Sequence, residues 1–392
     1  MQRIWRLLLI PSTFGALVWV FLMCLLALNV IRVDVSPYAV FVFLYVIACF
    51  LLSNTLMSRY FVGIDLVKIG KEMVCDNLDG GMFLFSTVLG LGGLYLYIVD
   101  FSQSFGGISQ FFYVFFTDPL QIRALAVDTT SMGFQISYFS WLSVFYCVLI
   151  LATGHAKTWP IRISLVVLGV LEFALNLLFI DRTRPTILFV ICALGFGVSR
   201  FGYIKHPLRL YAAIFLGPLV IFFGQAMYTG KYYYDEGLFS TFLIYILGGF
   251  GYFSSLLTNG IPDYSLERTF YPIAKVLEAF GMVGHVPPQI LDDRSVPFVT
   301  NVGTFLEPLI SDGGLLLVIV GAPLIIILID LLSLFALRAR SIPGLFVWAN
   351  MVVTVLFSFF VPKYNAAYMY LFVAIYVGLH FLRSRRSSQI VV

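Results

Sequence analysis

The sequence predicts an all-α protein whose helices cross a membrane, and three observations lead to this prediction. Hydrophobic residues make up 60% of the 392 residues and charged residues only 11%, and the mean hydropathy is +0.97. Soluble domains contain about 25% charged residues, so the composition excludes an ordinary water-soluble fold. The apolar runs are continuous rather than alternating, which favours membrane helices over a transmembrane β-barrel.

Ten apolar runs are long enough to form transmembrane helices, because about 20 residues span a bilayer. The first run follows basic residues and has no A-x-A-like exit, so we expect a first transmembrane helix rather than a cleaved signal. We expect residues 1–392 to form a single integral membrane domain. The expected spans are 8–31, 36–57, 80–100, 134–153, 161–180, 185–203, 208–228, 313–337, 344–362 and 364–382.

The distribution of charge predicts the orientation of these spans. With both termini in the cytoplasm, most of the 24 Lys and Arg residues lie inside and most of the 20 Asp and Glu residues lie outside. Cytoplasmic loops carry an excess of Lys and Arg, so we prefer this orientation to its inverse.

Two exterior loops are large, at 101–133 and 229–312. The first begins with an aromatic amphipathic stretch that we expect to lie along the membrane surface. The second contains the Gly-rich apolar segment 239–257. We interpret this segment as a re-entrant or interfacial helix, since an eleventh span would invert the charge bias of everything that follows. We expect the active-site cavity of this protein within the second loop, where exterior charge concentrates.

Arg182 and Arg184 occupy a short exterior turn between two expected spans. Guanidinium groups bind phosphate oxygens bidentately and stay charged at physiological pH, so this pair is a candidate clamp for a pyrophosphate. The alternative is that both arginines snorkel toward lipid headgroups, with Asp181 as a simple ion-pair partner.

Two further arginines, Arg123 and Arg268, lie one in each large exterior loop and are candidates for the same role. For each, the alternative is a solvated ion pair with a nearby acid, Asp128 or Glu267, which contributes little.

A general base for an acceptor hydroxyl requires a carboxylate or a histidine. His285 is the only histidine in the expected exterior loops, and no Cys, His or acidic cluster accompanies it, so we expect neither a metal site nor a cofactor. Exterior aromatic residues either form a membrane-interface belt or pack against sugar rings. The candidate bases are Asp128, His285, Asp292, Asp293 and Asp312, and the candidate sugar-binding residues include Tyr252 and Arg294.

Glu172 is the one acid well inside an expected span. An intramembrane carboxylate is a functional hypothesis by default. A hydrogen-bonded or protonated carboxyl between helices is an equally good interpretation, and a proton path would favour a transporter.

The segment 300–314, TNVGTFLEPLISDGG, resembles the O-antigen polymerase (Wzy-type) family of oligosaccharide repeat-unit polymerases. The family tends to show Thr-Asn, a Pro and then an Asp-aromatic-Gly step before a transmembrane helix. The Arg182-Thr183 pair and the layout of spans with one long late loop are also similar. The resemblance carries over Thr300, Asn301, Asp312 and Arg182, and Glu307 with a departure, because relatives often have a basic residue there and an aromatic where Gly313 stands.

The resemblance implies a GT-C-like membrane glycosyltransferase of the bacterial inner membrane. Its substrates would be oligosaccharide repeat units on undecaprenyl pyrophosphate, which it would join outside the cytoplasm without a metal ion. A polysaccharide chain-length regulator is an implied partner, and nucleic acid is not. An O-antigen ligase is one alternative, although Val286 after His285 departs from the ligase motif. A transporter of the same lipid-linked sugars and a non-catalytic scaffold are the others.

Overall fold

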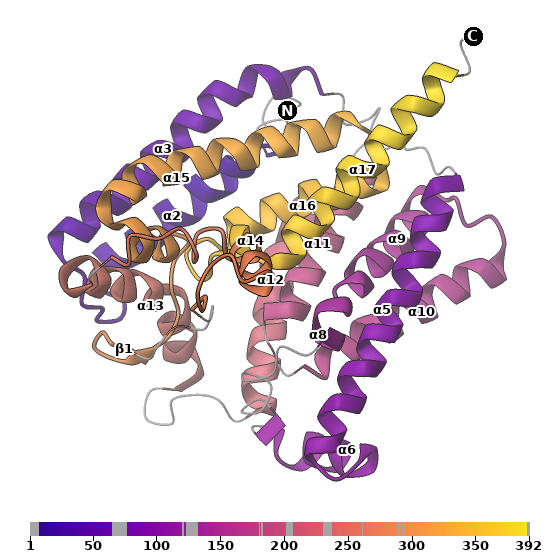
Figure 1. Cartoon of the computed structure of the whole chain (residues 1–392), viewed down its shortest axis with the longest axis horizontal. Helices are drawn as coiled ribbons and strands as arrows, with labels where there is room; N and C mark the ends of the chain where they lie inside the picture. Colours follow the sequence, from indigo (N-terminus) through magenta and orange to yellow (C-terminus); the bar gives the residue numbers. More distant parts are fainter. Residues whose placement is uncertain are drawn as a thin grey trace. The chain divides into compact units, whose positions relative to one another are not determined.

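The structure is a computed structural model, and its described residues belong to two compact units (Figure 1). Unit 1 comprises Met1–Ile64, Tyr233–Arg338 and Asn350–Val392, and unit 2 comprises Asp65–Tyr232 and Ala339–Ala349. The described residues are 8–64, 77–119, 121–122, 132–179, 181, 183–200, 207–229, 237–260, 262–287, 291 and 294–389.

The described residues confirm the all-α prediction, and their apolar helices are those of a membrane-embedded protein. Six helices are long and apolar enough to cross a membrane, by length and composition. Five of them fall on expected spans, and the sixth, Gly237–Asn259, covers the segment that we interpreted as re-entrant or interfacial. The remaining five expected spans contain shorter apolar helices: Pro11–Ala27, Thr183–Ser199, Leu216–Tyr228, Ile342–Leu356 and Ala367–Arg383.

Unit 1 is built from long helices that pack around a group of aromatic rings. Trp19 is fully buried, and its ring centroid lies 5.2 Å from that of Phe250 and 5.7 Å from that of Phe305. The Trp19 indole N–H donates a 2.8 Å hydrogen bond to Ser358 Oγ, so its polar atom is satisfied inside the core. The main helices are α2 (Pro11–Ala27), α3 (Pro37–Val62), α13 (Gly237–Asn259), α15 (Glu307–Arg338) and α17 (Ala367–Gln389).

The first helices of unit 1 begin at recognisable signals. Proline stands in the first turn of both α2 and α3, where its missing N–H costs nothing. Ser36 caps α3 by accepting the Ala39 N–H at 3.2 Å. The buried Asp330 of α15 accepts the Ser12 N–H at 3.0 Å and the Ser53 hydroxyl at 2.6 Å, so it ties the start of α2 to α3 and α15.

The polar part of unit 1 lies between α13 and α15 and in the turn before α17. α15 bends at Gly314, whose φ of 63° favours glycine and separates a short polar first segment from the apolar remainder. The elements here are α14 (Tyr271–Ala279), β1 (Arg294–Ser295), β2 (Val299–Thr300) and the 3-10 turn η1 (Lys363–Asn365). β1 and β2 pair antiparallel, with Arg294 opposite Thr300.

Unit 2 packs its helices closely because small residues line their contact. A Cβ added to Gly90 would lie 2.5 Å from the Ser140 nitrogen, so only glycine allows α5 to approach α9 this closely. The helices are α5 (Asn77–Ser104), α6 (Ile108–Thr117), α8 (Met132–Ile136), α9 (Phe139–Thr153), α10 (Trp159–Leu177), α11 (Thr183–Ser199) and α12 (Pro207–Tyr228). α16 (Ile342–Leu356) is divided between the two units at Asn350.

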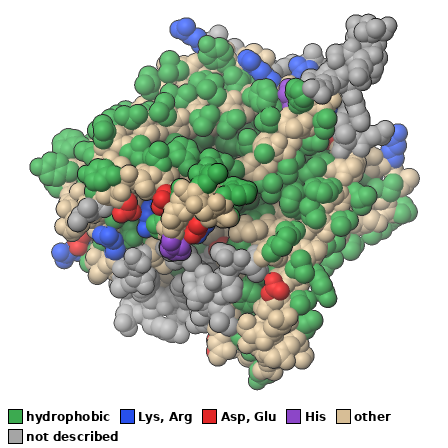
Figure 2. All heavy atoms as spheres, in the orientation of Figure 1, with side chains coloured by type: hydrophobic (Ala, Val, Ile, Leu, Met, Phe, Trp, Pro, Cys, Tyr) green, Lys and Arg blue, Asp and Glu red, His purple; other side chains and the backbone are tan. Residues whose placement is uncertain are grey.

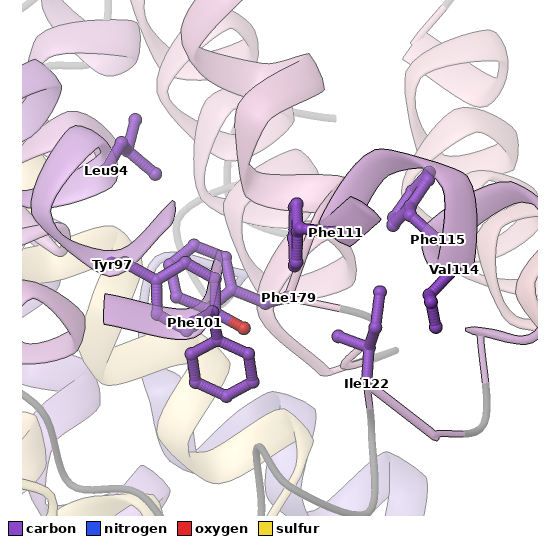
Figure 3. Close-up of a cluster of buried hydrophobic side chains, with 8 residues drawn as sticks. All are labelled: Leu94, Tyr97, Phe101, Phe111, Val114, Phe115, Ile122 and Phe179. Carbon is purple, nitrogen blue, oxygen red and sulfur yellow. The ribbon is translucent and has the colours of Figure 1, made fainter. Parts of the chain in front are cut away.

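The aromatic stretch at the start of the first exterior loop is helical. It forms the end of α5 and then α6, which buries one face and leaves Tyr113 and Phe116 exposed. Figure 3 shows the buried face, where side chains of α6 lie close to Tyr97 and Phe101 of α5. The cluster consists of Leu94, Tyr97, Phe101, Phe111, Val114, Phe115, Ile122 and Phe179.

Candidate functional site

A group of charged residues in unit 1 lies near α14. Figure 2 shows acidic, basic and histidine side chains close together there, on a surface that is otherwise mostly hydrophobic. Several of these residues belong to the connection between α13 and α15, and the contacts between them show which are rigidly held and which have free hydrogen-bonding capacity.

Asp312 is the anchor of this connection. Its side chain is completely buried. Its carboxylate accepts the Thr269 N–H at 2.7 Å, the Arg268 N–H at 3.3 Å and the Ser265 hydroxyl at 3.4 Å. Such charge-assisted bonds to backbone N–H groups are among the stronger hydrogen bonds in proteins. Asp312 therefore fixes the backbone of residues 265–269, and its oxygens are already occupied.

The side chain of Arg268 extends from this fixed backbone and is partly exposed. Its NH1 atom lies 3.4 Å from Glu307 Oε1, and the side-chain exposures of the two residues are 26% and 5%. The Arg268 carbonyl accepts a 2.8 Å hydrogen bond from Asn365 Nδ2 of η1. Its Nε is buried and has no hydrogen-bond partner among the described residues. The guanidinium thus has donors to offer a further ligand.

Glu307 lies at the start of α15, and its ion-pair partner is Arg268. Its Oε1 accepts the Ser311 hydroxyl at 3.0 Å in addition to the Arg268 contact. Backbone N–H donors stabilise the Asp312 carboxylate but do not cancel its charge, so two acids, Glu307 and Asp312, lie around Arg268. An anionic ligand would therefore have to compete with Glu307 for the guanidinium of Arg268.

Arg294 is held against α13. Its guanidinium carbon lies 5.4 Å from the centre of the Tyr252 ring, and its NH1 donates to Ser255 Oγ at 3.3 Å. Tyr252 is buried, so its ring serves here as a platform for the arginine. The sugar-stacking role predicted for Tyr252 would require the exposed ring face that this packing does not provide.

Thr300 and Asn301, which the family resemblance singled out, differ in burial. Thr300 is buried, its Oγ1 accepts the Val302 N–H at 3.2 Å, and a Cβ on Gly248 would lie 3.1 Å from that oxygen. Thr300 therefore shapes the turn that packs on α13. Asn301 is exposed.

His285 belongs to a surface network beside the site. Its Nδ1 lies 3.0 Å from Glu278 Oε1, and Glu278 Oε2 accepts from Lys275 Nζ at 2.7 Å. The hydrogen bond from Lys275 holds the pKa of Glu278 below its ordinary value. His285 is 82% exposed, which leaves its ring free to reach a substrate hydroxyl as a base.

Tyr364 and Asn365 were not predicted. They lie in η1, the short turn before α17, and the Tyr364 hydroxyl is buried without a hydrogen-bond partner among the described residues. The neighbouring Asn365 places this turn beside the site, because its Nδ2 donates to the Arg268 carbonyl at 2.8 Å, and Tyr364 interacts electrostatically with Glu307 and Asp312. The sequence offered one weak signal, the polar KYN step between two apolar spans.

Arg184 belongs to unit 2 and has a very different environment. It is 2% exposed, and its guanidinium carbon lies 3.8 Å from the Phe179 ring centre, 4.2 Å from that of Tyr138 and 4.6 Å from that of Phe134. Its NH2 donates to Ser137 Oγ at 2.8 Å. The exposed clamp that we expected at this turn is thus replaced, at Arg184, by an aromatic cage.

Several predicted site residues lie outside the described part of the chain: Arg123, Asp128, Arg182, Asp292 and Asp293. Among the described residues, no group of three His, Cys, Asp or Glu side chains is placed to hold a metal ion.

The described residues of the site therefore combine two arginines, a glutamate paired with Arg268, an anchoring aspartate and a buried tyrosine hydroxyl. This arrangement suits an anionic ligand that carries hydroxyl groups, because guanidinium groups bind the anion and the carboxylate accepts from a hydroxyl. We call Arg268, Arg294, Glu307, Asp312 and Tyr364 the arginine site. No protein-family model, curated protein or solved structure matches this chain.

Proposed function

We propose that this protein is a membrane glycosyltransferase that joins oligosaccharide repeat units carried on undecaprenyl pyrophosphate. Polymerisation would take place at the exterior face of a bacterial inner membrane, with both termini in the cytoplasm. The proposal combines the arginine site with the resemblance of residues 300–314 to the O-antigen polymerases. The single observation that carries most weight is the Arg268 guanidinium, which lies 3.4 Å from the buried Glu307 carboxylate and keeps an Nε without a partner among the described residues.

The chemistry requires stabilisation of the pyrophosphate that leaves the donor sugar. Arg268 supports this role, because its backbone is fixed by Asp312 and Asn365 while Nε has no partner among the described residues. A preorganised donor needs no rearrangement when charge develops in the transition state. The two arginines supply positive charge without requiring a metal ion.

The acceptor is a sugar hydroxyl, and it needs a base. Glu307 is one candidate, because the departure of the Arg268 guanidinium toward pyrophosphate would free an oxygen to accept the hydroxyl proton. His285 is the other, since it is exposed and held by Glu278. Asp312 is better suited to positioning, as its oxygens bind the backbone.

The test is a complementation experiment in cells that lack this chain. Wild type should restore a ladder of surface polysaccharide, whereas Arg268→Ala should restore only single repeat units, with polymer reduced about 100-fold as for loss of one transition-state donor. Arg268→Lys should recover only part, since lysine cannot bind bidentately. Arg32→Ala is the matched control, because Arg32 is an expected exterior arginine that is 84% exposed.

Each outcome separates this function from its alternatives. Accumulation of lipid-linked polymer that never reaches the cell surface would identify a ligase. Accumulation of single lipid-linked units on the cytoplasmic face would identify a transporter. A normal ladder with Arg268→Ala at wild-type protein levels would reject the arginine site as the catalytic centre.

A further inference from the structure

A repeated polar pattern begins just before α9 and continues along it, and the proposed function does not use it. Ser137, Ser140, Ser143 and Tyr146 follow one another at intervals of three residues, and all four side chains are fully buried. Residues three apart are neighbours on a helix, but each step turns by about 60°, so the series spreads around α9 rather than along one side. We call the neighbouring pair Ser140 and Ser143 the polar face of unit 2. The close approach of Gly90 to Ser140 explains why small side chains are needed at this contact. It does not explain why these small side chains carry hydroxyl groups.

α10 places its own polar residues against this face. Asn176 Nδ2 donates to Ser140 Oγ at 2.9 Å, and Asn176 Oδ1 accepts the Trp141 indole N–H at 3.1 Å. Glu172 lies one helical turn before Asn176, and its exposure is 0%. Ser143 is the hydroxyl of the polar face that acts on the Glu172 carboxyl, although the two groups are not placed to form a hydrogen bond. Glu172 is thus directed at the polar face.

Neither carboxyl oxygen of Glu172 forms a hydrogen bond within the described residues. The Ser143 hydroxyl is instead 2.8 Å from Thr87 Oγ1 of α5. The ionisable group that faces Glu172 from α9 is the Cys147 thiol, which in turn interacts with Cys192 of α11. No salt bridge joins Glu172 to a described cation.

Asp330 of unit 1 provides the comparison. It is equally buried, yet it accepts the Ser12 N–H at 3.0 Å and the Ser53 hydroxyl at 2.6 Å. An ionised carboxylate without such donors costs several kcal/mol to bury. The uncharged acid is the form that a dry site without donors accommodates. Asp330 therefore has donors that stabilise an ionised carboxylate, whereas Glu172 has none among the described residues.

We propose that Glu172 is a proton-binding site between the helices of unit 2, and that Ser143 is the hydroxyl through which its proton exchanges. Hydroxyl groups both donate and accept, and the Ser143 hydroxyl lies 2.8 Å from Thr87 Oγ1. The ligand is the proton itself, and the site does not depend on the proposed glycosyltransferase activity.

The test is infrared spectroscopy of the purified full chain in lipid nanodiscs, comparing wild type with Glu172→Gln. The difference spectrum should show the loss of one protonated-carboxyl band, and that band should shift in wild type after transfer to D2O. Asp330→Asn is the matched control and should lose carboxylate bands instead. Loss of carboxylate bands in Glu172→Gln would overturn the proposal, as would a protonated band that never shifts in D2O.

A second measurement, the unfolding temperature, tests whether the variant has a folding defect. Glu172→Gln replaces one neutral group with another of the same shape, so its unfolding temperature should match that of wild type. A marked fall in unfolding temperature would mean that the wild-type carboxyl is ionised and paired, and would also contradict the proposal. Glu172→Asp should keep a protonated-carboxyl band at a shifted frequency.

Discussion

Arg268 and Arg184 lie in two regions for which the sequence predicted the same role, the binding of a pyrophosphate, but the surroundings of the two side chains differ. Arg268 faces a carboxylate, is partly exposed and has an unpartnered Nε within the described residues. Arg184 is surrounded by the rings of Phe134, Tyr138 and Phe179 and is 2% exposed. The Arg268 guanidinium keeps a donor without a partner among the described residues, and the Arg184 guanidinium packs between aromatic rings.

The difference shows that the neighbours of an arginine, not its position at an exterior helix end, decide what it can bind. An aromatic cage attracts a cation but also prevents a phosphate from reaching it. A glutamate partner such as Glu307 leaves room for exchange, because an incoming anion can replace its carboxylate beside Arg268. The following predictions separate the two roles, beginning with the largest effect.

Arg184→Ala should lower the free energy of unfolding by about 3 kcal/mol, because it leaves a cavity and removes several cation–π contacts. Arg184→Met, which fills the cage with apolar volume, should recover most of that stability, as apolar replacements of buried ions often do. Thermal unfolding of the purified variants checks both. A folded Arg184→Met that makes no polymer would show that Arg184 belongs to the reaction after all.

Arg268→Ala should reduce polymer about 100-fold while leaving the unfolding temperature close to that of wild type, since its side chain is partly exposed and its backbone contacts remain. Polymer length and amount in complemented cells provide the measurement. If the loss of polymer came with loss of folded protein, Arg268 would be another structural arginine and the comparison would fail.

Asp312→Asn should act on the Arg268 side chain through the backbone, by weakening the hydrogen bonds from the Arg268 and Thr269 N–H groups. An uncharged amide oxygen is a poorer acceptor, so we expect a loss of about 1–2 kcal/mol in stability. Binding of a lipid pyrophosphate should fall together with stability. A variant with reduced catalysis but unchanged stability and binding would assign Asp312 to the chemical step.

Glu278 should give the smallest effect, visible only in the pH dependence. Because its pKa is lower in the folded chain than its ordinary value, its contribution to stability is present above the ordinary pKa and is lost as the pH falls through the folded pKa. The unfolding temperature of wild type should therefore fall further than that of Glu278→Gln when the pH drops below about 4, near the reference pKa of glutamate. Parallel pH curves for the two proteins would show that the Lys275 contact is unimportant.

The helices could be predicted from the sequence because they depend on local apolar composition. Each of the ten expected spans contains an apolar helix, and a further helix covers 237–259, where apolar residues and glycines were already apparent. The distribution of Lys and Arg predicts the orientation of helices and not their length. It therefore could not predict how long the helix at 237–259 would be.

The arginine site could be predicted only in part, because its contacts join distant residues. Arg268, Arg294, Glu307 and Asp312 were candidates by residue type and loop position. The bond from Thr269 to Asp312 spans 43 residues and has no local signal. Asn365 lies 97 residues from the Arg268 carbonyl that it binds. The burial of Arg184 could not be predicted, because a residue count does not show which side of α11 faces α9.

The most direct test of the central claim is the binding of undecaprenyl pyrophosphate to the purified full chain. The arginine site predicts that Arg268→Ala weakens binding by about 100-fold, that Arg268→Lys is intermediate and that Arg184→Met binds as wild type does. Unchanged affinity in Arg268→Ala, with loss of binding in a folded Arg184→Met, would contradict the account.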